Sequence, residues 1–157
     1  MRFLTPVLRR TRPARSTSPN SEPCRYVTGP VTAQSIIEQA ATARDAAWGL
    51  LKGSAIGFTG ADTPRGCLLA SSAISCSAEA ADVQAELATI RRGIETHLKK
   101  KVSRSIKAGE MAKDVDADAV AGHIMVVIQG MSTLVRDGAS RDKLMRVART
   151  AMLAWPR

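Results

Sequence analysis

The chain has 157 residues, of which 45% are hydrophobic and 3% aromatic, and its formal net charge is +9. This length favours one domain, and an apolar content made mostly of Ala, Val, Ile, Leu and Met favours an all-α fold over a sheet. Because no run of about 18 apolar residues occurs, no transmembrane helix and no membrane association are expected.

Residues 1–30 differ in composition from everything after them. They hold five prolines and are rich in Arg and Ser, and proline is disfavoured inside helices, so a disordered extension is predicted. Residues 1–25 carry six arginines against one glutamate, which is more than half of the net positive charge. A twin-arginine signal or a transit peptide is a weaker interpretation. The body, residues 31–157, is only mildly basic, as a solvated helix surface explains.

Helical spacing of apolar residues begins at Thr32 and continues to about Leu51. Thr32 or Ser35 is the expected N-cap, and the sequence Gly60 to Pro64 ends the helix. A short helix is predicted after Gly66, from Cys67 to about Cys76. These elements form the first part of a predicted bundle of about five helices.

A long amphipathic helix is predicted next, with Ser77 as its N-cap. Its apolar residues recur every three or four positions and form one stripe: Val83, Leu87, Ile90, Ile94, Leu98, Val102 and Ile106. Basic residues crowd its last turns, where the helix dipole favours cations. Gly109 is the expected end of this helix.

Two further helices complete the predicted fold. The first begins at the N-cap Asp116 and ends at Asp137-Gly138, and its apolar face is broad. The second begins after Ser140 and is stopped by Pro156.

The polar residues do not form a recognisable catalytic or metal site. Cys67 and Cys76 are nine residues apart with no CxxC pair, which excludes the usual zinc spacings. His97 is interpreted as a partly exposed structural histidine, and for His123 a helix–helix hydrogen bond is favoured over a ligand role. No phosphate-binding loop or HExxH motif occurs. We therefore predict no enzyme, no cofactor and no metal, and three cysteines without a secretory signal favour the cytoplasm.

Gly130 points to an interface. A glycine inside a helix costs roughly 1 kcal/mol relative to alanine, so it suggests close packing. The two C-terminal helices together carry more apolar surface than one small core absorbs, which indicates a helical homodimer. The expected interface residues lie on these two helices: Val127, Gly130, Met131, Leu134, Leu144 and Ala151.

Three segments carry a family resemblance: TPRGCLL, VIQGMSTLVRDGAS and the terminal LAWP. With their order and separations, residues 32–157 resemble the C-terminal regulatory domain of TetR-type transcriptional repressors. The resemblance implies a homodimer whose last two helices form a four-helix bundle with the partner. It also implies a pocket for a small, often apolar ligand, and DNA-binding heads that precede this domain.

The expected pocket residues combine helical spacing with this resemblance: Trp48, Leu51, Cys67, Ser71, Ile94 and Gln129. Residues 1–30 are too short and too rich in proline for the family's helix-turn-helix, so no DNA-reading residues are predicted. Two hypotheses follow. The first is a dimerising, ligand-sensing regulatory domain without its own DNA head. The second is a nonspecific nucleic-acid-binding protein acting through the basic arm, with binding that is weak and indifferent to sequence.

Overall fold

The structure is a computed structural model that describes residues 32–61, 65–71 and 81–156, and all regular structure in these ranges is helical. The predicted all-α fold is therefore confirmed. The predicted disordered extension, residues 1–30, lies outside the described residues, and so do Cys24, Cys76 and the predicted cap Ser77.

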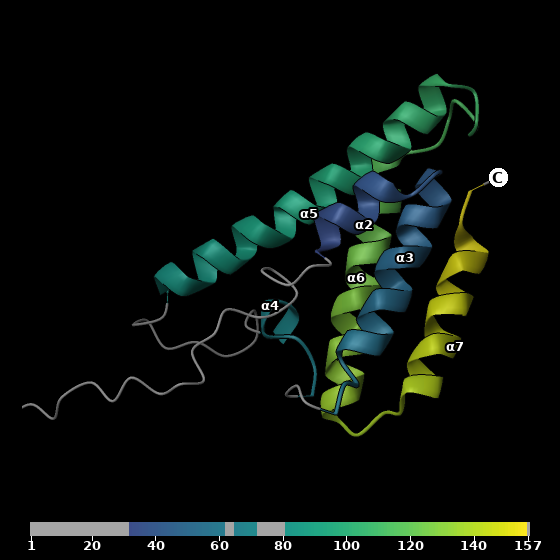
Figure 1. The fold of residues 1–157 in the computed structure, drawn as a ribbon. Coiled ribbons are helices and arrows are strands. Elements are labelled where there is room, and N and C mark those ends of the chain that lie inside the picture. Colours follow the sequence, from purple (N-terminus) through teal and green to yellow (C-terminus); the bar gives the residue numbers. More distant parts are fainter. Residues whose placement is uncertain (1–31, 62–64, 72–80, 157) are drawn as a thin grey trace, which may run out of the picture.

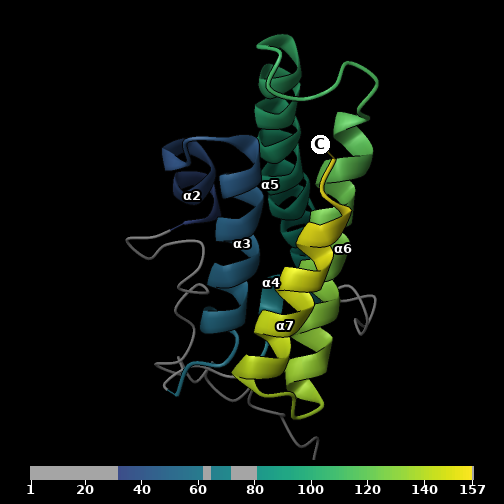
Figure 2. The ribbon, with the colours of Figure 1, turned by 90° about the vertical axis from the view of Figure 1, so that its right-hand side faces the viewer.

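The helices follow one another in the order α2 to α7, and a 3₁₀ turn ends the chain (Figure 1). Their bounds are α2 Ala33–Gln39, α3 Ala43–Gly57, α4 Leu68–Ser71, α5 Ala81–Lys107, α6 Ala117–Arg136, α7 Arg141–Ala151 and η2 Met152–Ala154. The long α5 crosses the other helices obliquely, and its first turns project beyond them. Figure 2 shows α6 and α7 side by side at one edge of the bundle.

Helix α3 is at the centre of the bundle, in contact with α2, α5, α6 and α7. Small side chains make this possible, since Ala43, Ala46, Ala47 and Ala55 are all buried on it. At Gly49 a Cβ atom would lie 2.7 Å from Cγ2 of Ile36, so only glycine allows α2 to pack this closely.

The residues at the helix ends explain most of the boundaries. Thr32 caps α2 together with Ser35, through hydrogen bonds of 3.1 and 2.9 Å in the two directions. Asp116 caps α6 by accepting bonds from the backbone N–H groups of residues 118 and 119. Gly109 has φ +77° just after α5, a conformation that few other residues adopt. These three boundaries confirm the sequence predictions.

One boundary differs from the prediction. The apolar spacing predicted one helix from Thr32 onward, but Ala40 is extended and the chain starts a new helix at Ala43. Thr42 forms a capping box there, because its hydroxyl accepts from the N–H of Asp45 and the Asp45 carboxylate accepts from the N–H of Thr42. This cap separates α2 from α3 despite the continuous apolar pattern.

Candidate functional site

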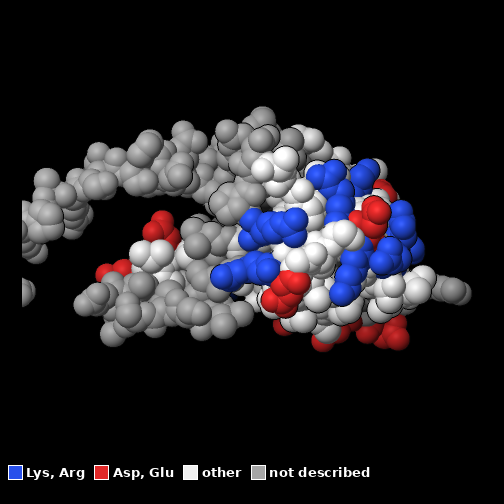
Figure 3. Space-filling view, turned by 90° about the horizontal axis from the view of Figure 1, so that it is seen from below, with Lys and Arg blue, Asp and Glu red and all other residues white. Residues whose placement is uncertain are grey.

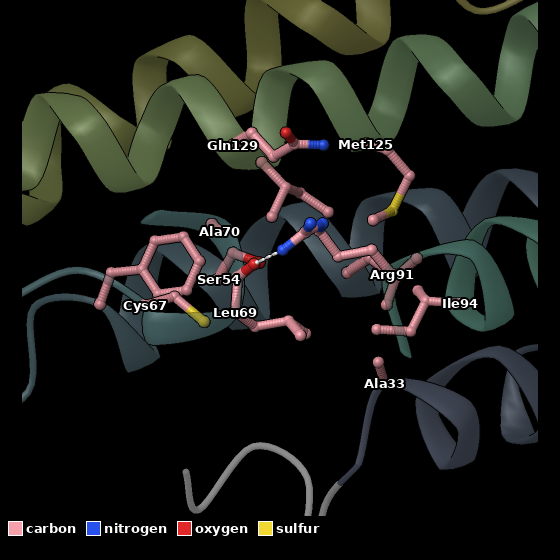
Figure 4. A pocket seen from close by; sticks show the side chains of 12 residues that line it. Ala33, Ser54, Cys67, Leu69, Ala70, Arg91, Ile94, Met125 and Gln129 are labelled. Carbon is pink, nitrogen blue, oxygen red and sulfur yellow. Dashed lines mark hydrogen bonds between the residues drawn. The ribbon is translucent and has the colours of Figure 1, made fainter. Parts of the chain in front are cut away.

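A cavity of about 40 Å³ lies between the helices and is lined by residues from α2, α3, α5, α6 and the segment around α4 (Figure 4). Its lining residues are Ala33, Leu50, Ser54, Phe58, Cys67, Leu69, Ala70, Arg91, Ile94, Met125, Ile128 and Gln129. One water molecule needs roughly 10–15 Å³ on this measure, so about three water-sized groups fit inside. The cavity therefore suits a small molecule.

The wall of the cavity is predominantly apolar. Leu50, Phe58 and Ile94 supply apolar side chains from two helices. Among the polar residues, Arg91 turns its charged end to the backbone, where Nη1 donates to the carbonyl oxygen of Leu69 at 2.5 Å. Figure 4 shows this bond beside Ser54. This environment favours a neutral, apolar occupant, because a charge enclosed by apolar side chains is costly.

The segment that leads into α4 is hydrogen-bonded to α6. Gly66 has φ +91°, and a Cβ atom there would lie 3.0 Å from Cγ of Arg136 and 3.2 Å from the hydroxyl oxygen of Ser132. The backbone N–H of Cys67 donates to the Ser132 hydroxyl at 2.9 Å. Since Cys67 also lines the cavity, Ser132 determines where this part of the wall lies.

Replacing Ser132 by alanine is expected to lower the free energy of unfolding by about 1–3 kcal/mol, because the Cys67 N–H loses a buried acceptor. Ser132 is fully buried at 0% exposure, so water cannot easily replace the hydroxyl. Urea unfolding at fixed protein concentration measures the change. Thr89→Ala is the control, because residue 89 is exposed on α5, outside both the cavity wall and the outer face of α6, and should change stability by less than about 0.5 kcal/mol. Equal losses in the two variants would contradict the assigned role of Ser132.

Three of the six expected pocket residues lie along the cavity: Cys67, Ile94 and Gln129. Leu51 does not, because it points into the core one position round the helix from Leu50, which does line the cavity. Trp48 does not line the cavity either. It is half-buried and packs against the core. For Ser71 the side chain is not among the described ones.

The sequence analysis missed several lining residues that share a helix face with the ones it found. Arg91 precedes Ile94 by three residues and Met125 precedes Gln129 by four, which places each pair on one side of its helix. Phe58 is the C-cap of α3 and lies four residues after Ser54. It was not predicted because the nearby glycines interrupt the apolar pattern. Counting one helical turn back from Ile94 and from Gln129 would have identified Arg91 and Met125.

The outer face of α6 is a second candidate site. No Asp, Glu, Lys or Arg occurs between Asp118 and Arg136, although Val126 is 68% exposed. Gly130 is exposed on this helix, and a Cβ atom there would meet nothing within 4 Å. Of the expected interface residues, Val127, Leu134 and Ala151 are partly exposed. The central part of this face thus carries no Asp, Glu, Lys or Arg, although His123 and Thr133 are exposed on it, and no described residue covers it.

Two expected interface residues need correction. Met131 and Leu144 are both 0% exposed, since they point into the core that α6 and α7 share with α3. Such side chains contribute to a dimer only by supporting the helices that carry the interface. Val126 replaces them as the most exposed apolar residue of α6.

Apart from Arg91, the described charged residues lie away from the cavity and from the central part of the outer face of α6. Lys99 donates to the Asp118 carboxylate at 2.6 Å, and this hydrogen bond raises the pKa of Lys99. Figure 3 shows Lys and Arg side chains, with Asp and Glu among them, over the described part of one face of the molecule. Arg141 donates to the hydroxyl of Thr59 at 2.9 Å and joins α7 to the end of α3. No group of three or more His, Cys, Asp or Glu suited to a metal ion occurs among the described residues.

Comparison with known proteins gives a consistent result. Residues 53–152 match the family described as "Tetracyclin repressor-like, C-terminal domain". The HTH-type transcriptional repressor ComR of Escherichia coli is 32% identical over 99 residues, which are 63% of this chain and 47% of that protein. The chain thus spans about half the length of this curated relative.

The solved structures that resemble the chain include two cysteine mutants of CifR, a TetR family transcriptional regulator, complexed with 26-base-pair double-strand operator DNA. Both have a TM-score of 0.73, and their sequence identities are 28% and 27%. Each alignment covers 79% of this chain and 65% of the CifR chain. The resemblance therefore includes both sequence and fold.

Proposed function

The chain belongs to the TetR family of transcriptional regulators through its C-terminal domain, and from this premise we propose that residues 31–157 are a ligand-sensing, dimerising regulatory domain. The observation that carries the proposal is the apolar cavity lined by five parts of the chain. A hollow in a small core forfeits packing contacts, which suggests that a ligand fills it. Catalysis is not part of the proposed role.

The proposed ligand is small, neutral and apolar. The wall offers Leu50, Phe58 and Ile94 to it, whereas the guanidinium of Arg91 is engaged with the carbonyl of Leu69. The cavity of about 40 Å³ limits the ligand to a few heavy atoms, unless side chains shift to enlarge it.

Thermal unfolding in the presence of small apolar compounds tests this proposal. Xenon, butane and cyclopentane are expected to raise the melting temperature, because a ligand that binds only the folded state stabilises it by mass action. At a concentration of 100 times the dissociation constant, the gain is about 2.7 kcal/mol. Ile94→Trp, which fills the cavity, is the control and should abolish the shift. Absence of any shift across a series of such compounds would refute the ligand-sensing role.

The proposed oligomer is a homodimer formed by the outer faces of α6 and α7. A helix face exposed to water normally carries charged residues, and the central part of α6 carries none. Gly130 adds a second argument, because nothing within its own chain requires a glycine there. A second copy that approaches along this face would account for both features. An interface of this permanent type buries more than about 2,000 Å².

Contact with a membrane is a less favoured explanation for the uncharged outer face of α6. By length and composition α6 is long and apolar enough to cross a bilayer, and 33% of its most apolar stretch is buried inside the chain. However, the same helix contributes Ile124, Met131 and Val135 to the core. Because α6 cannot leave the bundle without exposing that core, a partner copy is the better occupant.

DNA binding is proposed for a larger assembly that contains this domain together with DNA-binding heads. ComR is described as an HTH-type repressor and CifR is bound to operator DNA, so we propose that the domain acts in transcription from the cytoplasm. Its ligand would change how associated DNA-binding heads engage DNA. The alternative of a nonspecific nucleic-acid-binding arm has no support in the comparisons, and residues 1–30 lie outside the described ones.

A further inference from the structure

A surface groove adjoins the cavity. It has a volume of about 280 Å³ and lies between the start of α2 and the middle of α5. Cavity and groove share three wall residues, which are Ala33, Leu69 and Ile94. Figure 4 shows these three residues together along one side of the cavity. Their side chains therefore lie between the cavity and the groove.

The groove is lined by both polar and apolar side chains. Thr32, Gln34 and His97 are polar, whereas Ile90 and Ile94 provide apolar surface. A small apolar molecule in the groove would exchange water for contacts with these isoleucines, which is favourable.

Gly93 lies in this groove, and among the described residues none packs closely against it. A Cβ atom at residue 93 would meet nothing within 4 Å. By contrast, Gly49 is required by the close approach of Ile36, and Gly66 by its positive φ. A glycine in the middle of α5 lowers helix stability relative to alanine. Its missing side chain is thus explained by the open groove, not by packing.

We propose that the ligand reaches the cavity through this groove, and that the absence of a side chain at Gly93 sets the size of the molecule admitted. Ile94, which faces both hollows, is then the inner barrier. This inference rests on the proposed ligand-sensing function. It adds a route and a residue that determines specificity by size.

Xenon is a suitable probe, because it is apolar and small enough for the cavity. Saturation-transfer ¹²⁹Xe NMR on the full chain gives both the exchange rate and the dissociation constant. Gly93→Phe is expected to slow exchange at least tenfold, while the dissociation constant changes less than about threefold, since a barrier slows binding and release equally. Gly93→Ala is the matched control, with about the wild-type exchange rate.

Ile94→Ala provides the opposite test and is expected to accelerate exchange about threefold or more, by lowering the barrier between groove and cavity. It also keeps the proposal testable if the phenylalanine variant fails to fold. Unchanged exchange in a folded Gly93→Phe variant, or in Ile94→Ala, would overturn the route alone. If xenon does not bind the wild-type protein, the route and the ligand-sensing function fail together.

Discussion

Val126→Arg is expected to convert the proposed homodimer into a monomer. Val126 is 68% exposed in the single chain, so the substitution leaves the core of each protomer intact. In the dimer the arginine would be placed in an apolar interface with no acidic residue between Asp118 and Arg136 to pair with it. Because a two-fold interface contains the substitution twice, the dissociation constant is expected to rise at least about 100-fold, or about 2.7 kcal/mol.

Sedimentation velocity over a range of concentrations measures this change, and circular dichroism verifies the fold. Val83→Arg is the matched control, because Val83 is 56% exposed in the first turn of α5, which projects from the bundle (Figure 1). It should associate like the wild type. A wild-type protein that is monomeric at micromolar concentration would contradict the dimer. A Val126→Arg variant that remains dimeric would place the interface elsewhere.

The sequence predicted the fold well wherever a local signal marked the end of a helix. Asp116 and Ser140 accept backbone N–H bonds at the starts of α6 and α7, as their residue types suggested. The boundary at Thr42 was missed because apolar residues recur at helical spacing on both sides of it. The signal was present in the Thr42 and Asp45 pair, but the apolar pattern outweighed it in the interpretation.

The cavity was harder to predict, since it depends on the rotation of each helix about its axis. Leu50 and Leu51 are equally apolar, yet one lines the cavity and its neighbour fills the core, about 100° further round α3. Arg91 was missed for another reason. It shares a helix face with Ile94, but its charge suggested a solvated position, whereas in the structure its charged end bonds to the carbonyl oxygen of Leu69.

Phe58→Ala is expected to have the largest effect on stability among the cavity residues. Phe58 is 2% exposed, follows directly after α3 and forms part of the cavity wall. Truncating a buried phenylalanine costs about 3–5 kcal/mol, because both its burial and its packing contacts are lost. Loss of the ring also leaves a space in the cavity with the size and shape of benzene, so benzene should bind the variant.

Benzene is therefore expected to restore about 2 kcal/mol of the lost stability of Phe58→Ala, which corresponds to a concentration some 30-fold above its dissociation constant. Urea unfolding with and without benzene, at one fixed protomer concentration, measures the recovery. Ser132→Ala is the control, because it also destabilises the cavity wall but removes a hydrogen bond and creates little space. Recovery confined to Phe58→Ala would locate the ligand beside residue 58. If benzene stabilises both variants equally, the space left by the Phe58 ring does not hold it, because only one of the two substitutions opens that space.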